Sequence, residues 1–155
     1  EYSSYTKEEL PKLWSILEDA DLLIGFNSDA FDIPLLNRYY PGELSHLRSL
    51  DLMTEVQKVL GRRIRLQSLA EATLGRGKSG DGLQASEWWK EGKKDKVREY
   101  CIEDVRLTRE LYDYALAHDV LKYKDLQKIR DIKLDTSLWG NEKEGTPIMT
   151  HALPL

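Results

Sequence analysis

A short apolar run that ends in a polar corner constrains the fold of this chain more than any other feature. Residues 22–26, LLIGF, are continuously apolar, and such a run is typical of a strand buried in a mostly parallel sheet. Asn27, Asp29 and Asp32 follow within six positions. Since a helix is expected over about 31–40, the pattern predicts a strand that passes into a helix through a carboxylate-rich corner.

Helical periodicity and capping signals predict further elements on both sides of this corner. The spacing of Thr6 and Glu9, and again of Ser68 and Glu71, is that of a capping box. The expected elements are a helix over 7–19, a strand within 46–52, a helix capped by Asp51 that reaches about residue 60, a short helix that follows Ser68 and stops at Gly75, and a long helix over about 94–117.

The long helix and the segment before it carry specific expectations. The glycine-rich residues 75–82 lack the spacing of a phosphate-binding loop and follow a helix, so we expect a connector. Paired Trp88 and Trp89 are more often packing residues than base-stacking ones. The expected buried side of the long helix consists of Val97, Cys101, Val105, Leu107, Leu111 and Leu116.

The chain divides by pattern into residues 1–121 and a tail over 122–155. Within the tail, residues 131–139 and 146–155 are strand-like and enclose a turn at 140–145, which predicts a C-terminal β-hairpin.

Composition excludes some classes of function. The 155 residues are 41% hydrophobic, which suits one core, and the net charge of −4 gives no overall attraction to nucleic acid or to an anionic membrane. No apolar stretch reaches the roughly 20 residues that span a bilayer. The single cysteine suits a reducing compartment, so we expect a cytoplasmic protein without a membrane partner. Phosphate contacts would come first from Arg62, Arg63 and Arg65, or from residues 90–98.

Acidic side chains in two distant segments are candidates for a common site. Tyr100 and Asp104 lie four residues apart on the long helix, so they share one face. Asp32 follows a strand of an α/β sheet, where ligand sites gather at the carboxyl ends of strands. Carboxylates that converge repel one another unless a cation compensates them, which favours a divalent metal. Taken singly, Asp32 would be read as a helix-start acid and Tyr100 as a half-buried helix tyrosine.

These residues carry a family resemblance. Asn27-Ser28-Asp29-Ala30-Phe31-Asp32 resembles the second motif, and Tyr100-x3-Asp104 the third motif, of the tyrosine-bearing DEDD 3′–5′ exonucleases in the ribonuclease-H-like superfamily. The chain is similar to the proofreading exonuclease domain of family B DNA polymerases and to small stand-alone bacterial exonucleases, over about residues 20–117.

The resemblance implies an α/β fold, a mixed sheet flanked by helices, and removal of nucleotides from single-stranded DNA or RNA 3′ ends. It implies that Asp32 and Asp104 are catalytic metal ligands for two Mg²⁺ or Mn²⁺ ions, and that Tyr100 positions the attacking water. Asn27 and Phe31 match positions that border the substrate strand, whereas Asp29 matches a non-catalytic position.

One departure limits this inference. The first motif of the family, Asp-x-Glu, supplies two of its four acids and occurs nowhere in the 155 residues. We expect an amino-terminal truncation that leaves the sheet without its first strands and the chain inactive or nearly so. A less favoured reading uses Asp135 as a displaced first motif, although Ser137 then stands where Glu is required.

Other functions remain open from the sequence alone. A degenerate ribonuclease-H-like fold that binds nucleic acid or protein without cleaving is the main alternative to an exonuclease. A fragment of a polymerase is a third reading.

Overall fold

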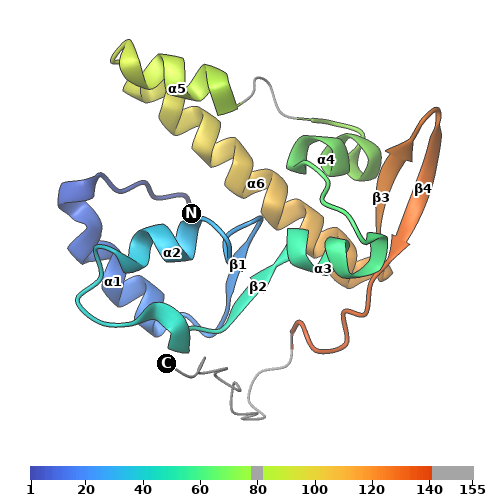
Figure 1. The fold of residues 1–155 in the computed structure, drawn as a ribbon, viewed down its shortest axis with the longest axis horizontal. Coiled ribbons are helices and arrows are strands. Elements are labelled where there is room, and N and C mark those ends of the chain that lie inside the picture. Colours follow the sequence, from blue (N-terminus) through green and yellow to red (C-terminus); the bar gives the residue numbers. More distant parts are fainter. Residues whose placement is uncertain (78–81, 141–155) are drawn as a thin grey trace.

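The computed structural model describes residues 1–77 and 82–140, and Figure 1 shows how helices and small sheets follow one another along the chain. In chain order the elements are η1 Lys7–Glu9, α1 Leu10–Asp19, β1 Leu23–Gly25, α2 Asp32–Asn37, η2 Leu44–His46, β2 Ser49–Asp51, α3 Leu52–Leu60, α4 Leu66–Leu74, α5 Gly82–Lys90, α6 Lys94–His118, β3 Val120–Asp125 and β4 Lys128–Lys133.

The first helical segment forms where the sequence predicts it. The backbone N–H and hydroxyl of Thr6 both donate to the Glu9 carboxylate, at 3.1 and 3.2 Å, so the predicted capping box is present. Trp14 is the buried residue of α1. Its ring meets that of Tyr40 edge-on at a centroid distance of 5.3 Å, which joins α1 to the turn after α2.

Strands β1 and β2 form a parallel two-stranded sheet. Their register pairs Leu23 with Ser49, Ile24 with Leu50 and Gly25 with Asp51. The strand at residues 22–26 is confirmed, but its expected burial is wrong, since Ile24 is 40% exposed. Among the described residues β1 pairs with β2 alone, so the sheet lacks the further strands and covering layers that bury a parallel strand.

Helix α3 follows β2 directly, and α4 follows α3 after a short loop. Asp51 caps α3 by accepting a hydrogen bond from the Met53 N–H at 3.0 Å, as predicted. Gly75 ends α4 in the left-handed conformation, also as predicted. The expected cap at Ser68 is wrong, because extended backbone at Arg65 already starts α4 one turn earlier.

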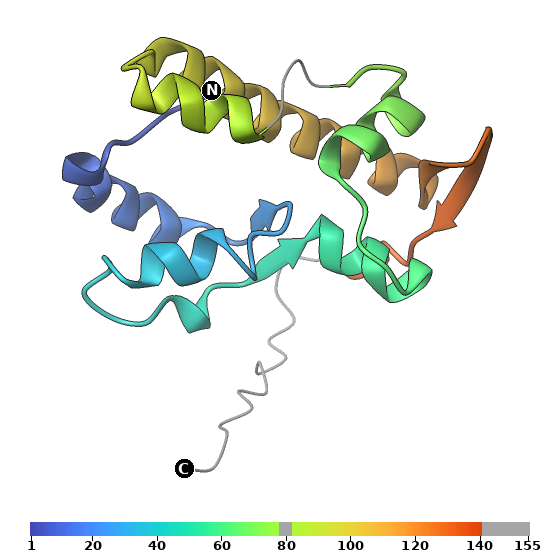
Figure 2. The same cartoon turned by 45° about the horizontal axis from the view of Figure 1, so that its top comes forward.

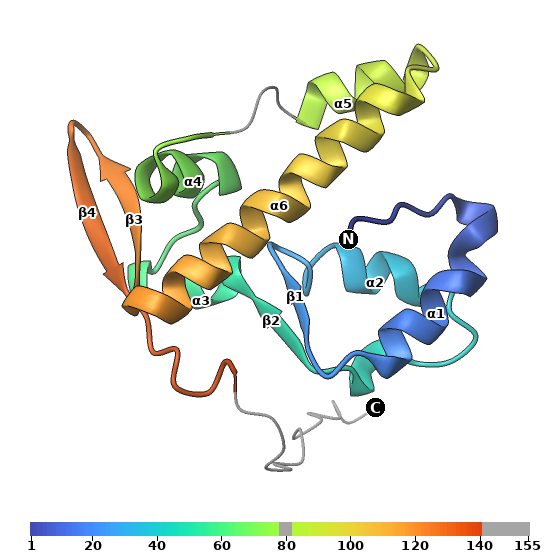
Figure 3. The same cartoon turned by 180° about the vertical axis from the view of Figure 1, so that it is seen from behind.

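Helices α5 and α6 lie side by side, and α6 is one continuous helix of 25 residues (Figures 1 and 3). Leu107 and Leu111 are buried as expected, together with Thr108 and Ala115. Burial was wrongly predicted for Cys101, Val105 and Leu116, which are exposed, while Val97 is half-buried. The reason is that the core touches only the carboxyl-terminal half of α6, along one narrow stripe.

A hairpin follows α6, but it is not the predicted one, whose strands were expected at 131–139 and 146–155. Asp119 ends α6 in the left-handed conformation and β3 starts at the next residue. Strands β3 and β4 pair antiparallel, from Val120 with Lys133 to Asp125 with Lys128. Residues 131–139 therefore supply only the end of β4, and 146–155 lie outside the described residues. The boundary at residue 121 stays a prediction.

The core lies between α3, α4, α6 and the hairpin (Figure 2). Its buried members are Leu52, Val56, Ile64, Leu69, Ala70, Leu107, Leu111, Ala115, Leu121, Ile132, Leu134 and Trp139. Trp139 closes one side by stacking on Tyr112 at a centroid distance of 5.8 Å. Within the ranges that the structure describes, no helix combines the length and apolarity needed to cross a membrane.

Candidate active site

The polar corner after β1 is organised by a carboxylate from the neighbouring strand. Asp51, only 4% exposed, accepts hydrogen bonds from the backbone N–H groups of Asn27 at 2.7 Å and Asp29 at 3.1 Å. It also accepts the Met53 bond that caps α3. One carboxylate therefore fixes the loop after β1 and the start of α3 together.

Sequence reasoning assigned Asp51 to the helix cap alone and missed its second task. The parallel register sets Asp51 beside Gly25, so its side chain emerges where the chain turns into the corner. A signal was available, because neighbouring parallel strands end at the same edge of a sheet. Asn27 has a positive φ of 62°, and this left-handed backbone points its N–H at Asp51.

The side chains of Asp29 and Asn27 are also held by hydrogen bonds. The carboxylate of Asp29 accepts a hydrogen bond of 2.6 Å from the Ser49 hydroxyl, which suits the non-catalytic position expected for it. The side-chain oxygen of Asn27 accepts a hydrogen bond from the Arg63 guanidinium. Arg63, from the loop after α3, thereby reaches the corner. Phe31 is 62% exposed.

Asp32 and Asp104 line one cavity of about 790 Å³. One wall comes from β1 and the corner, including Ile24, Phe26 and Ser28, and the other from α6. The Ser28 hydroxyl is buried there without a hydrogen-bond partner among the described residues. Two acids that are distant in the sequence are thus brought together by the packing of α6 beside β1.

The pKa of Asp32 also reflects its proximity to other acids. Asp32 is exposed as a residue, but partial burial of its carboxyl group raises the pKa above the ordinary value. The carboxylates of Asp51 and Asp104 raise this pKa further, against a hydrogen bond from the backbone of Asp32 that lowers it. A carboxyl group that is penalised for ionising beside other acids is suited to a cation.

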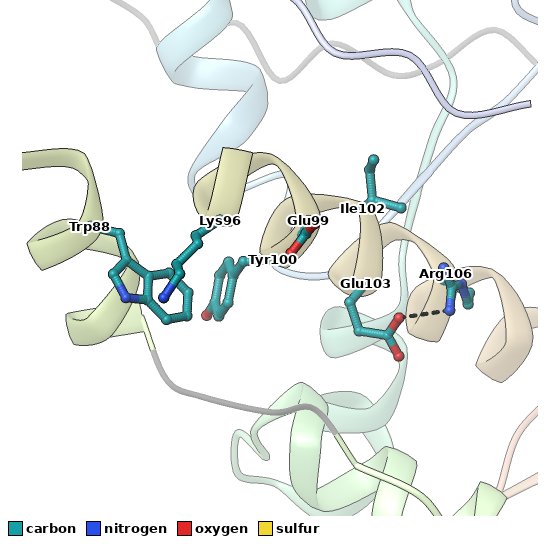
Figure 4. Close-up of a pocket in the computed structure, with 7 residues that line it drawn as sticks. All are labelled: Trp88, Lys96, Glu99, Tyr100, Ile102, Glu103 and Arg106. Carbon is teal, nitrogen blue, oxygen red and sulfur yellow. Dashed lines mark ion pairs between the residues drawn. The ribbon is translucent and has the colours of Figure 1, made fainter. Parts of the chain in front are cut away.

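Tyr100 occupies a neighbouring pocket. It lies one turn before Asp104 on α6, but it lines a separate cavity of about 600 Å³ with Trp88, Lys96 and Arg106 (Figure 4). Its ring meets that of Trp88 near-perpendicularly at 6.4 Å, because this face of α6 turns toward α5. The structure therefore does not bring Tyr100 into the cavity that Asp32 and Asp104 share.

The two tryptophans before α6 differ in environment. Trp88 is half-buried against Tyr100, as a packing residue would be. The packing expected of Trp89 is wrong, since it is 61% exposed with the Lys94 ammonium 5.9 Å from its ring centroid.

Asp135 lies elsewhere. It borders a different cavity, of about 610 Å³, with residues that include Ser49 and Leu50. Its carboxylate accepts hydrogen bonds from the hydroxyl of Ser137 at 2.6 Å and from the backbone N–H of Ser137 at 3.1 Å, and these lower the pKa of Asp135. This geometry is that of a local turn.

The donor set fits a divalent metal only in part. Asp32 and Asp104 offer the hard oxygen ligands that Mg²⁺ and Mn²⁺ prefer. Asp51 is close, but its oxygens accept three backbone N–H groups. In residues 1–77 and 82–140 no group of three or more acidic, histidine or cysteine side chains is placed to hold an ion.

Comparison with known families agrees with this fold. The family profile described as the RNase H superfamily matches residues 2–116. The chain belongs to the RNase H superfamily. The expected ribonuclease-H-like α/β fold that lacks some of its strands is confirmed for the described residues, which form six α-helices and two small sheets. No match was found among curated proteins or among solved structures. Membership of the RNase H superfamily indicates nuclease-type chemistry on nucleic acid, for which divalent metals are typical.

Proposed function

We propose that this RNase H superfamily domain is part of a metal-dependent 3′–5′ exonuclease that hydrolyses phosphodiester bonds at single-stranded DNA or RNA ends. The observation that carries the proposal is the pair of acids, Asp32 and Asp104, on one cavity at the carboxyl end of β1. That position is where α/β sheets place their ligands. The 3′–5′ direction of cleavage is inferred from the resemblance of the two motifs that contain these acids to those of 3′–5′ exonucleases.

The roles follow from the side chains. Asp32 and Asp104 would hold a divalent cation, and a bound cation of this kind activates water and stabilises the leaving oxyanion. Asn27 and Phe31 border the path of the strand, Phe31 with an exposed ring that offers a stacking face. Tyr100 is assigned to orienting the water, which requires its ring to leave the Trp88 pocket when substrate binds.

Two further acids are needed for the full site. The chain contains no Asp-x-Glu, and the described cavity wall opposite Asp104 consists largely of apolar residues in and next to β1. We therefore expect this chain to cleave slowly or not at all unless two further carboxylates complete the site. The single cysteine is consistent with a cytoplasmic setting, which is proposed on that basis.

A non-catalytic binding module is the second candidate. It is favoured by one observation, that the described residues do not complete a three-ligand metal site. In that case nucleic acid would bind without being cleaved.

Metal binding by the chain itself tests the acid pair. We expect Mn²⁺, followed by electron paramagnetic resonance, to bind the wild-type chain weakly, and binding to fall at least tenfold in Asp32→Asn and in Asp104→Asn. Asp135→Ala is the matched control, and it should bind Mn²⁺ like wild type. An equal loss of Mn²⁺ affinity in Asp135→Ala would support the reading of Asp135 as a displaced first motif. Unchanged Mn²⁺ affinity in both Asp32→Asn and Asp104→Asn would rule out the proposed metal site.

Hydrolysis is tested in the full-length product of the gene. A 5′-labelled oligonucleotide should then shorten from its 3′ end in Mg²⁺, and Asp104→Ala should abolish the shortening. An oligonucleotide that stays intact under all metal conditions but is bound favours the binding module.

A further inference from the structure

Positive charge is concentrated in two segments of a chain that is acidic overall. The loop 61–65 contains three arginines and no acid, and the hairpin segment 120–133 contains five Lys or Arg and two Asp. Together they have a net charge of +6. Since the whole chain has −4, the other residues have −10, so a polyanion is repelled by most of the molecule and attracted here.

The two segments are joined in space. The Arg62 guanidinium lies over the Tyr123 ring of β3, 5.4 Å from its centroid. Figures 1 and 3 show the loop after α3 beside the base of the hairpin. On its other side the loop reaches the candidate active site, because Arg63 donates to the side chain of Asn27. The loop is therefore a bridge between the hairpin and the corner.

Strand register extends this line toward the hairpin tip. Tyr123 pairs with Arg130, and Asp125 pairs with Lys128. Because side chains alternate along a strand, these four residues share one face, the face on which Arg62 lies. Arg130 forms an ion pair of 2.7 Å with Asp125 but remains exposed, as does Lys128.

We propose that Arg62, Arg63, Lys128 and Arg130 form a basic strip that binds the phosphodiester backbone of a single-stranded nucleic acid and leads it to Asn27. The proposal deepens the proposed function and rests on it for the identity of the polyanion. Arginine suits phosphate because its planar guanidinium donates two parallel hydrogen bonds. Cations spaced along one line match a chain of regularly spaced phosphates better than a compact anion.

The other basic segment is a weaker candidate. Residues 87–99 contain five Lys or Arg but also four acids. The net charge of +1 on segment 87–99 is small beside the +6 of the two joined segments, so this segment is a suitable control.

The test is fluorescence anisotropy of a 5′-fluorescein single-stranded oligonucleotide of 20 thymidines, titrated with the full chain in EDTA at several salt concentrations. The double variant Arg62→Gln/Lys128→Gln should weaken binding by roughly 10- to 60-fold at 50 mM salt, and should reduce the slope of log K against log salt by about 1.4, or about 0.7 for each lost phosphate contact. The control Lys90→Gln/Lys94→Gln loses the same charge and should stay within about twofold of wild type. The charge-preserving variant Arg62→Lys/Lys128→Arg should restore most of the affinity.

Equal losses in the test and control variants, or no loss in either, overturn the proposal. Tighter binding of a labelled poly-glutamate peptide than of the oligonucleotide overturns it in favour of an acidic protein partner. EDTA keeps this assay independent of hydrolysis. If the full-length protein never cleaves but the Arg62/Lys128 variant loses affinity for the oligonucleotide, the basic strip is supported and the exonuclease function is rejected. If cleavage is found but the variants bind normally, the reverse holds.

Discussion

The region from α3 to Trp139 and the region from α1 to β2 bury their apolar residues very differently. The first contains the whole contiguous core, in which the leucines at 52, 69, 107, 111 and 121 are inaccessible to solvent. In the second, Trp14 and Leu44 are the buried hydrophobic residues. Figure 2 shows the helices of the second region set apart from the hairpin end of the molecule.

This difference shows what holds the candidate active site together. Asp104 stands on a helix anchored in the core, whereas Asp32 stands on the poorly packed α2. At the corner, Asp51 accepts hydrogen bonds from Asn27 and Asp29 in its own region and from Met53 at the start of α3. Arg63 adds a second link between the regions by donating to Asn27. Site geometry therefore depends on one carboxylate as much as on apolar packing.

The largest expected effect tests the contrast in packing directly. Leu111→Ala should destabilise the protein by about 3 kcal/mol, because it opens a cavity in a close-packed core. Leu35→Ala is the matched change on α2, where the side chain is 43% exposed, and should cost less than about 0.5 kcal/mol. Urea denaturation measures both. Similar costs would mean that the two regions are equally packed.

Removing the carboxylate at the corner should have the next largest effect. Asp51→Ala leaves three backbone N–H groups without their acceptor, and should cost about 2 kcal/mol. Asp51→Asn keeps one acceptor oxygen and should cost less. The backbone amide signals of Asn27 and Asp29 should shift in NMR spectra of both variants. Unchanged stability in Asp51→Ala would show that packing alone holds the corner.

A change in the N-terminal region should stay local. Trp14→Ala removes the buried residue of α1 and its contact with Tyr40. We expect faster hydrogen exchange in α1 and α2, and a change below about 1 kcal/mol in the free energy of global unfolding, because this region opens before the core does. Protection lost equally in α6 would contradict the division into two regions.

The smallest effect concerns the carboxyl group of Asp32. Since its pKa is raised in the folded state, ionisation destabilises the fold as pH rises through that pKa, and the penalty is absent below the unfolded value. Asp32→Asn should thus raise the melting temperature slightly at pH 7 and leave it unchanged near pH 3. Asp104→Asn should lower the pKa of Asp32, measured by NMR titration. An unchanged pKa of Asp32 would show that the two carboxylates do not interact.

Several elements could be predicted because their signals are local. The capping box at Thr6, the cap at Asp51 and the glycine stop at Gly75 each specify an end of a helix through nearby backbone groups. The long helix was predicted within a residue or so at its ends, since its apolar spacing persists over many turns.

Burial and the placement of site residues were less predictable. The apolar run of β1 is the same in a two-stranded sheet as in a larger one, so the exposure of Ile24 depends on strands beyond its own sequence. Tyr100 and Asp104 share a helix face within one turn, but α5 packs against Tyr100 and β1 lies near Asp104. Their separation into two cavities is set by tertiary neighbours that no local spacing reports.

The uninterrupted course of α6 has a mechanical consequence. Core leucines begin three residues after Asp104, and each residue turns an α-helix by about 100° and advances it by about 1.5 Å. A single-residue insertion between Asp104 and Leu107 would therefore leave the leucines seated while swinging the acid a quarter-turn or more away from Asp32. Because the core holds the carboxyl-terminal half of α6, the rotation of this helix about its axis sets the direction in which the Asp104 side chain points.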